Sequence, residues 1–371
     1  MQRRDFMRLG AAATAGLALP RTASSAPEEA APPSAMSAPA ATPGWRTYET
    51  TTRVEVLKPA GITRVWLPTP LTQDTPYQRS LANSWRAEGG MVAQWIDPAW
   101  SVGAVWAEFP PGVRPVLELT NRFATRDIAV DLSTPGTAPA ESAATLKRFT
   151  APTDLLPTGG IVRSTSAAIV KGAKGDLEKA KALYEWVVEH GYRDPKTRGC
   201  GLGDVKFMLD HKALGGKCAD LNALFVALAR AQGIPARDVY GIRVAPSALG
   251  YASLGKGGGD ITKAQHCRAE FYLPTHGWVP VDPADVRKVI LEEGGGKAPT
   301  DPMVVAARKR LFGSWEMNWL ALNYGHDLTL PRSTRGKISF LMYPQAETGE
   351  GRLDCLDPEN FKYTIGSRSA V

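Results

Sequence analysis

The sequence predicts an α+β fold, in which an antiparallel β-sandwich domain precedes a domain of helices and antiparallel strands. Short runs that alternate apolar and polar residues occupy residues 45–132, and Pro and Gly separate these runs. Two amphipathic helical stretches follow, and a β-hairpin pattern comes after the second of them. The 36 glycines and 29 prolines also favour a loop-rich, β-containing architecture over a helical bundle.

The composition excludes several classes of protein. The 371 residues are 43% hydrophobic and 22% charged, which is typical of a globular protein and allows two or three domains. Residues 1–26 carry +3 of the net charge of +7, and the rest of the chain has no run dense in Lys and Arg. We therefore expect no nucleic-acid partner. The four cysteines form no CxxC pair, so the sequence predicts no disulfide scaffold, no metal site and no cofactor.

Residues 1–26 have the features of an export signal. Arg3 and Arg4, followed by the letters DFM, resemble a twin-arginine signal, and small residues at 23–26 suit cleavage. The apolar stretch from Leu9 to Leu19 is shorter than the ~20 residues of a membrane span. We therefore expect a periplasmic protein without stable membrane insertion after cleavage; the alternative is an amphipathic N-terminal helix on a cytoplasmic protein. Residues 27–44 are rich in Ala, Pro and Ser, which predicts a disordered linker.

The β-sandwich domain is predicted over residues 45–140. Its candidate strands are the runs TRVEVLK, TRVWLP, GAVWAEF, PVLELTNRF and DIAVDL. No cluster of titratable residues stands out among them, so we expect this domain to be structural or to orient a substrate. Residues 133–160 have turn chemistry and predict a linker.

Two amphipathic helices are predicted after this linker. The first, DLEKAKALYEWVVEHGY, has these apolar residues at helical spacing: Ala180, Leu183, Tyr184 and Val187. The second ends at Gly233, and one of its faces carries Leu221, Leu224, Phe225 and Leu228. Nearer the C-terminus, PMVVAARKRLFG predicts a helix and KISFLMYP a strand.

Cys218 is the first candidate for chemistry, since it follows a Gly-Gly turn at the start of the second helix, in the motif GGKCADLNALF. Unpaired backbone N–H groups and the positive end of the helix dipole favour a thiolate there. The glycines would also let a substrate approach the sulfur closely. The alternative is a buried structural cysteine, but Cys218 precedes the apolar stripe by three residues.

His266 begins the first strand of the predicted hairpin, HCRAEFYL. Side chains alternate along a strand, so this histidine shares a face with Arg268, Glu270 and Tyr272. The other face, expected in the core, carries Cys267, Ala269, Phe271 and Leu273. Cys267 should then point away from the place where His266 acts, which argues against a metal site that uses both. A lone histidine at a strand end is more often structural.

Asp282 ends the second strand of the hairpin, GWVPVD. The turn at Pro274–Gly277 places His266 and Asp282 at the same open end of the hairpin, within diagonal reach. A carboxylate there would hydrogen bond to the imidazole, hold its tautomer and stabilise the imidazolium. Two alternatives stay open: Asp282-Pro283 as a simple turn signal, and Asp285 as a competing carboxylate.

A helix-start cysteine, then a strand histidine, then an aspartate on the next strand is more specific than any of the three alone. This order resembles the transglutaminase-like superfamily, among the papain-like cysteine enzymes. The resemblance covers about residues 176–285, through GGKCADLNALFVALARAQGIPARDVYGIRV and HCRAEFYLPTHGWVPVDPAD. It implies a papain-like transglutaminase core, with the helix-start cysteine packed on an antiparallel sheet, within a catalytic domain at 150–330. Residues 331–371 are expected to add strands that pack on the preceding domains.

The resemblance also implies roles for these residues. Cys218 would be the nucleophile, His266 the general base and acid, and Asp282 the orienting carboxylate. The backbone N–H of Cys218 is one candidate oxyanion donor, and no upstream Trp or Gln identifies a second. No acidic cluster resembles the calcium sites of animal tissue transglutaminases, so the resemblance does not imply calcium.

Other features have weaker interpretations. Cys200 and Asp204 are expected on a constrained loop that borders the cleft, and Cys200 and Cys355 are candidates for a disulfide. The loop Gly255–Asp260 lacks the pattern of a phosphate loop and is interpreted as a flap over the cleft. Residues expected to be structural or in the core are His190, His211, His276, His326, Trp315, Trp319 and Tyr324.

These observations predict an exported cysteine-dependent acyl-transfer enzyme with a peptide or protein substrate. A thioester on Cys218 would pass its acyl group to water, as in a protease or amidase, or to an amine, as in a transamidase. The alternative is a non-catalytic peptide-binding module on the same fold. The sequence does not predict the oligomeric state.

Overall fold

The computed structural model describes residues 44–257, 259–357 and 359–370. The predicted signal sequence at 1–26, and the predicted linker at 27–44 except for its last residue, lie outside the described residues. The described residues belong to one compact unit, and the domain boundaries expected at 140, 150 and 330 stay predictions.

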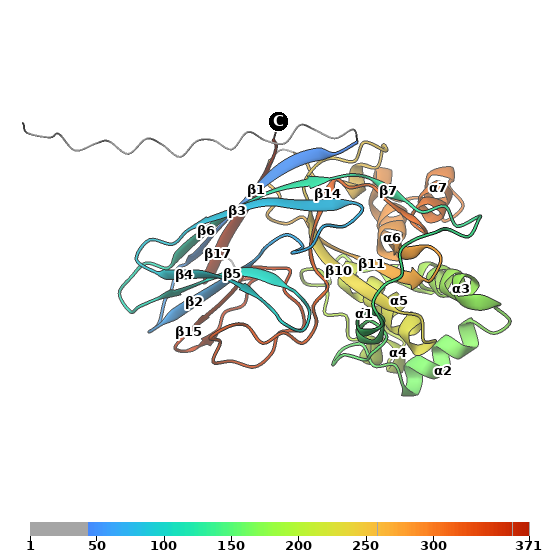
Figure 1. The fold of residues 1–371 in the computed structure, drawn as a ribbon, viewed down its shortest axis with the longest axis horizontal. Coiled ribbons are helices and arrows are strands. Elements are labelled where there is room, and N and C mark those ends of the chain that lie inside the picture. The colour runs from blue at the N-terminus through green and yellow to red at the C-terminus, as the bar shows by residue number, and fades with distance from the viewer. Residues whose placement is uncertain (1–43, 258, 358, 371) are drawn as a thin grey trace, which may run out of the picture. The chain divides into compact units, whose positions relative to one another are not determined.

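Two antiparallel sheets pack face to face and form a β-sandwich (Figure 1). The strands of the first sheet, in spatial order, are β17 (Phe361–Ser369), β1 (Arg46–Val56), β6 (Val116–Thr125) and β3 (Gln78–Arg86). Those of the second are β16 (Gly351–Arg352), β15 (Gln345–Thr348), β2 (Thr63–Pro68), β5 (Gly103–Phe109) and β4 (Met91–Ile96). Val54 and Leu117 from one sheet meet Val65 and Val105 from the other in the shared core.

Alternation of buried and less buried residues explains why the predicted runs form strands. Along β1 every second residue from Tyr48 to Val56 is buried, as expected for a strand with one face toward a core. β3 and β4 were not predicted, because their residues are mostly exposed and show no clear apolar alternation. The run DIAVDL contributes only β7 (Ile128–Ala129), which pairs with β13 (Ser314–Trp315).

The helices gather around a second four-stranded antiparallel sheet (Figure 1). Its spatial order is β12 (Gly277–Val281), β11 (Gln265–Leu273), β10 (Ala236–Arg243) and β14 (Trp319–Asn323). The helices are α1 (Ala143–Arg148), α2 (Gly160–Ile169), α3 (Gly175–His190), α4 (Val205–Asp210), α5 (Cys218–Ala231), α6 (Pro283–Glu292) and α7 (Pro302–Arg310). Short elements complete the order: β8 (Tyr192–Arg193) pairs with β9 (Gly215–Gly216), and η1 (Ala252–Leu254) and η2 (Glu293–Gly295) are 3-10 turns.

The predicted helices and hairpin are confirmed. The four apolar residues of α3 named above are buried, and β11 and β12 form the hairpin around the predicted turn. α5 differs from the prediction of a single apolar face, because every residue from Cys218 to Arg230 is buried. Surrounding elements cover this helix on all sides, so it is the central helix of the core.

Two predictions of local structure are wrong. The linker predicted at 133–160 contains α1, which begins after the N-cap Ser142. The segment KISFLMYP is not a strand; the strand β15 begins only at Gln345. Ile338 and Leu341 pack in one hydrophobic cluster, and Met342 and Tyr343 pack in another. The apolar residues of this segment therefore contact two separate clusters instead of lining one face of a sheet.

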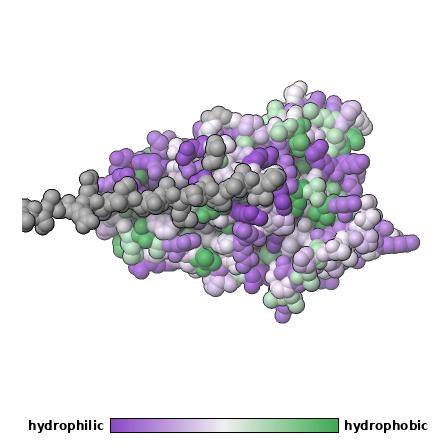
Figure 2. Space-filling view, turned by 45° about the horizontal axis from the view of Figure 1, so that its top comes forward, coloured by the Kyte–Doolittle hydropathy of each residue, from purple (hydrophilic) through white to green (hydrophobic). Residues whose placement is uncertain are grey.

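Hydrophilic side chains are interspersed with small hydrophobic areas on the face seen in Figure 2. This mixture is ordinary for a protein surface. Within the described residues, no helix is long and apolar enough to cross a membrane.

Candidate active site

Cys218 is the first residue of α5, as predicted, and its side chain is buried. Asp220, in the same turn, accepts a hydrogen bond from the Lys217 N–H at 2.9 Å and two more from Leu202 and Gly203 at 3.0 and 2.9 Å. The carboxylate therefore holds the preceding loop against the start of the helix. A Cβ on Gly216 would overlap this carboxylate, so the Gly-Gly turn is explained by packing in addition to access for a substrate.

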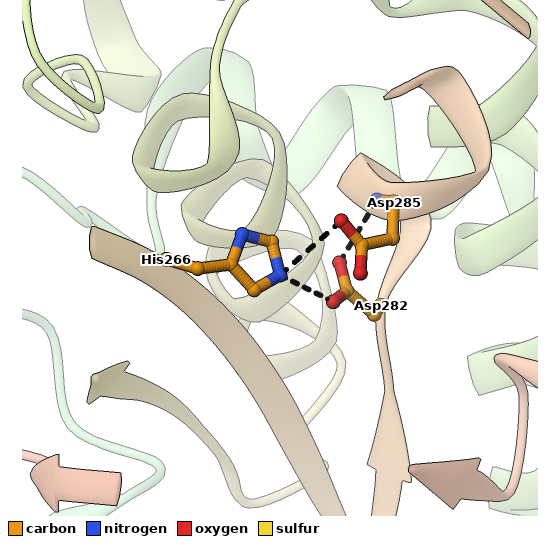
Figure 3. A group of neighbouring side chains, drawn as sticks. All are labelled: His266, Asp282 and Asp285. Carbon is orange, nitrogen blue, oxygen red and sulfur yellow. Dashed lines mark hydrogen bonds and ion pairs between the residues drawn. The ribbon is translucent and has the colours of Figure 1, made fainter. Parts of the chain in front are cut away.

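His266 and Asp282 lie together at the open end of the hairpin, as the turn predicted (Figure 3). His266 Nε2 and Asp282 Oδ2 are 2.7 Å apart, and both side chains are buried. Asp282 also caps α6, since its Oδ1 accepts a hydrogen bond from the Asp285 N–H at 3.0 Å. Asp282 is thus the N-cap of a helix, not a simple turn signal, and it is also a hydrogen-bond partner of His266.

Asp285 contacts the same nitrogen of His266, at 3.3 Å (Figure 3). Its two oxygens also accept hydrogen bonds from Arg243 Nη2 at 2.6 and 2.8 Å. Burial would raise the pKa of Asp285, but the charges of Arg243 and His266 hold it well below its usual value. For Asp282, burial and the neighbouring Asp285 raise the pKa. The carboxylate predicted as a competitor is therefore a second partner of the imidazole.

The two aspartates set the protonation state of His266. Burial and Arg243 lower its pKa, but Asp285 and Asp282 raise it more, and the result is a pKa of about 9. The imidazolium is thus favoured at neutral pH. Because Nε2 faces the carboxylates, Nδ1 is the ring nitrogen that remains for Cys218 (Figure 3).

Three neighbouring side chains affect the pKa of the Cys218 thiol: Cys200, Cys267 and His266. Cys200 and Cys267 lower its pKa; burial opposes this, and the charge of His266 lowers it further. The pKa ends well below the usual value for a thiol. Together with the raised pKa of His266, this favours a thiolate–imidazolium pair.

The expectation for Cys267 is wrong. Its side chain is in the core, as are Ala269, Phe271 and Leu273, but the same core cluster holds Cys218, so Cys267 lies near the nucleophile instead of pointing away from the site. Alternation along β11 places Cys267 toward α5, and α5 begins with Cys218. Facing the core and facing the nucleophile are therefore the same direction here.

All four cysteines are free. Cys200 lies on the loop beside the site, as expected, and its Sγ donates a hydrogen bond to the Gln265 carbonyl at 3.3 Å. Its backbone carbonyl accepts a hydrogen bond from the Ala219 N–H at 2.9 Å, which ties this loop to the first turn of α5. Asp204, the other residue named on this loop, is the N-cap of α4. No disulfide between Cys200 and Cys355 is present.

Sequence reasoning missed three residues at the site. Asn222 Nδ2 donates to the Cys267 carbonyl at 2.9 Å and lies 3.4 Å from Asp282 Oδ1. Its spacing of four residues from Cys218 on a helix was a usable signal. Arg243, on β10, and Tyr343, in the same core cluster as Cys200 and Cys218, carry no local pattern that connects them to Cys218.

A metal ion is not needed to explain this cluster. Within the described residues, His266, Asp282 and Asp285 are the group whose ligand atoms lie within 4.8 Å of one another. The Arg243 guanidinium already provides the positive charge beside Asp285, and His266 Nε2 is used by Asp282. The donors are thus occupied by partners within the chain.

A pocket of about 620 Å³ is lined by both Cys218 and His266. Gly255 and Lys256 of the predicted flap line it, as do residues of β17 from the end of the chain. The pocket thus exposes the two reactive groups to a ligand, although both side chains are buried.

Comparison with known proteins gives a family and several relatives. Residues 163–283 match the family described as the transglutaminase-like superfamily. An uncharacterized protein of Haemophilus influenzae is 34% identical over 340 residues, which are 86% of this chain and 91% of that protein. A proposed cysteine protease from Cytophaga hutchinsonii is 14% identical, with a TM-score of 0.49 over 87% of this chain and 98% of the other. The periplasmic domain of TgpA from Pseudomonas aeruginosa is 16% identical, with a TM-score of 0.34 over 66% and 91%.

Proposed function

The chain belongs to the transglutaminase-like superfamily, and from this premise we propose that it is a cysteine-dependent acyl-transfer enzyme acting on peptide or glutamine-type amides. One observation carries the proposal: Cys218, at the start of α5, lines the same pocket as His266, and His266 is 2.7 Å from Asp282. This is the nucleophile, base and orienting group that covalent acyl transfer requires.

In the first step, the Cys218 thiolate attacks the amide carbonyl carbon and forms a C–S bond. The backbone N–H of Cys218 has no acceptor within α5, because it is the first of the helix, and it supports the developing oxyanion. His266, as imidazolium, protonates the departing nitrogen, so the C–N bond breaks and an amine leaves. A thioester and a neutral imidazole remain.

In the second step, the neutral imidazole accepts a proton from the incoming nucleophile. Water gives a carboxylic acid and regenerates the thiol, as in a protease or amidase, whereas an amine gives a new amide. Asp282 keeps the imidazole oriented through both steps, and it stabilises the imidazolium form. Hydrolysis and transamidation share every residue named here and differ only in the acceptor.

The test is to incubate the purified protein with a peptide library and a labelled primary amine, and to identify the products by mass spectrometry. Cleaved or deamidated peptides indicate hydrolysis, and labelled peptides indicate transamidation. Cys218→Ala must lose either product. Full biological activity in that variant would overturn the enzyme and favour the non-catalytic binding module.

A second measurement tests the activated thiol without a substrate. Iodoacetamide should alkylate Cys218 faster than Cys200 or Cys355. The neighbouring Cys218 and burial raise the pKa of Cys200 well above its usual value, and burial and Asp354 raise the pKa of Cys355 to about 11. Equal rates at the three cysteines would contradict the thiolate–imidazolium pair.

We also propose that the chain is exported to the periplasm through a twin-arginine signal. The support is the sequence of residues 1–26, with Arg3-Arg4 before a short apolar stretch. Cell fractionation of the wild type and of an Arg3→Lys/Arg4→Lys variant tests this. The variant should remain in the cytoplasm with its signal uncleaved, and equal export of both proteins would contradict the twin-arginine route.

A further inference from the structure

The pocket beside Cys218 has an unusual charge. Among the described residues that line it, eight are basic and none is acidic. The basic residues are Arg193, Arg198, Lys217, Arg243, Lys256, Lys263, Lys288 and Lys362. The reactive thiol therefore lies in a pocket with side-chain charges of one sign.

Half of these basic residues are already paired. Arg193 and Lys288 contact Glu292, Arg198 contacts Asp354, and Arg243 contacts Asp285. Since a paired charge is largely cancelled for an incoming ligand, these four contribute little net field.

The other four form the lysine set of the pocket: Lys217, Lys256, Lys263 and Lys362. Within the described residues, no carboxylate lies within the 4 Å ion-pair distance of any of them. Asp260, on the loop between Lys256 and Lys263, hydrogen bonds to the Thr262 N–H at 2.9 Å and offsets part of their charge. The pocket thus keeps an excess of positive charge.

The lysine set converges from three separate parts of the chain. Lys217 directly precedes Cys218, Lys256 and Lys263 lie on the segment before β11, and Lys362 is on β17. Three of the four are exposed and free to reach a ligand, while Lys217 is partly buried at the start of α5. No local run of basic residues produces this arrangement, so folding alone concentrates the charge at the thiol.

A second large pocket of the structure does not have this excess of basic residues. The pocket of about 700 Å³ beside Glu270 is lined by Arg126, Arg148 and Arg237 together with four acidic residues. The acidic residues are Asp74, Asp127, Glu141 and Glu270. Its charges nearly balance, whereas those of the Cys218 pocket do not.

We propose that the substrate is an acidic peptide, whose carboxylates flank the reacting amide and bind to the lysine set. The proposal rests on the acyl-transfer function proposed above. A concave pocket lined by charges of one sign raises the local concentration of an oppositely charged ligand, by about 10- to 1000-fold in association rate at low salt. Lysine amines bind carboxylates as point charges, so they select for acidity without requiring one geometry.

A pair of alkylating reagents tests the field at the thiol without any substrate. Iodoacetate carries a carboxylate, and iodoacetamide is its neutral analogue. The ratio of their rates at Cys218 should be about 10-fold higher in the wild type than in Lys256→Glu/Lys263→Glu, and high salt should remove the difference. The matched control is Lys58→Glu/Lys171→Glu, which makes the same charge change at exposed lysines that do not line this pocket. A ratio that is equal in the three proteins would overturn the charged pocket.

Peptides then test the substrate class. Three peptides share one reacting glutamine and differ only in flanking residues, which are Glu, Gln or Lys. The wild type should have the highest kcat/KM for the Glu-flanked peptide, by about 10-fold over the Gln-flanked one at low salt. Lys256→Glu/Lys263→Glu should shift the preference toward the Lys-flanked peptide, which a merely structural role of these lysines would not do.

The outcomes separate this inference from the proposed function. If the wild type turns over all three peptides equally, the acidic substrate is wrong and the enzyme stands. If iodoacetate is favoured but none of a broad peptide library is turned over, the proposed function fails, and the acidic peptide substrate fails with it. Inhibition of peptide turnover by a single-stranded oligonucleotide as strong as by a Glu-rich peptide would show a general polyanion site and overturn the selection of peptides.

Discussion

Two buried histidine–aspartate pairs lie on the same antiparallel sheet, and only one of them adjoins a thiol. His266 is 2.7 Å from Asp282, and His326 is 3.2 Å from Asp238, which lies on β10. The two histidines are 4% and 3% exposed. The two pairs are equally buried, but only the contact between His266 and Asp282 is a hydrogen bond, and both carboxylate oxygens of Asp238 lack a hydrogen-bond partner.

Their surroundings are different. His326 packs against the rings of Trp100 and Tyr240, with centroids 5.9 and 5.6 Å away, so aromatic side chains enclose it. His266 lines the pocket of about 620 Å³ together with Cys218. The comparison teaches that a histidine–aspartate pair indicates chemistry only when a nucleophile and an accessible pocket adjoin it.

The largest expected effect comes from removing the nucleophile. Cys218→Ala should lower kcat/KM by about 10⁴-fold or more, because no other group forms the thioester. Its melting temperature should change little, since the substitution removes only one sulfur atom. Turnover by this variant within 10-fold of the wild type would contradict the role of Cys218 as the nucleophile beside His266.

Substitutions at the two histidines should separate an effect on catalysis from an effect on stability. His266→Gln should lower kcat/KM by about 10³-fold, because the thiolate loses its partner and the leaving amine its proton donor. His326→Gln should keep kcat/KM within about threefold and cost about 1–3 kcal/mol in the free energy of unfolding, through loss of its buried polar contacts. Urea unfolding and kinetics on both variants make the comparison, and equal losses of activity would contradict it.

The pH profile of kcat/KM should depend on His266 and not on His326. With a His266 pKa of about 9 and a Cys218 pKa well below its usual value, kcat/KM should be flat near neutral pH and fall above about pH 9. The fall on the acid side reports protonation of the thiolate. His326→Gln should leave the acid-side and the alkaline-side fall of kcat/KM at the same pH values as in the wild type. If kcat/KM of the wild type fell on the alkaline side near pH 6.5, this would contradict the raised pKa of His266.

The same shift predicts a pH dependence of stability. A folded-state pKa raised from 6.5 to about 9 contributes stability below pH 6.5 that is lost as the pH rises through 9. The lowered pKa of Cys218 acts in the opposite direction, so the measurement uses Cys218→Ala. Its unfolding free energy should fall between about pH 6.5 and 9, and this fall should be smaller in Cys218→Ala/His266→Gln. Identical curves for the two variants would contradict the shift.

The smallest effect is expected from Cys200→Ala. This variant removes the thiol that contributes most to the lowered pKa of Cys218, so the acid limb of kcat/KM should move to higher pH. Alkylation of Cys218 near pH 6 should slow by several-fold, while the rate at pH 9 changes little. An unchanged acid limb would mean that His266 alone activates the thiol.

Local patterns were sufficient to predict much of the fold and the positions of Cys218, His266 and Asp282 in it. Apolar spacing predicted α3 and α5, and the turn at Pro274–Gly277 predicted that His266 and Asp282 meet. Helix and hairpin contacts join residues that are near in sequence, so their period and turns are visible in the chain. β3 and β4 were missed because their residues, which are exposed or partly buried except for Gln78, show no such period in the sequence.

The position of Cys267 was the instructive error. The alternation along β11 was correct, yet the conclusion that this thiol avoids the site was wrong. Alternation says which face of a strand a residue occupies, but it does not say what packs on that face. The placement of α5 over β11 decided that Cys267 meets Cys218.

The sequence by itself determined a helix-start cysteine and a hairpin that joins a histidine to an aspartate, because both depend on short-range geometry. Only the tertiary structure decided that Cys200, Cys267 and Asp285 complete the site, and that Lys362 from β17 reaches the same pocket. These contacts join segments up to about 160 residues apart, through packing that leaves no periodic trace in either segment. Local sequence patterns thus identify the reactive groups, whereas the tertiary structure determines their pKa values and the charge around them.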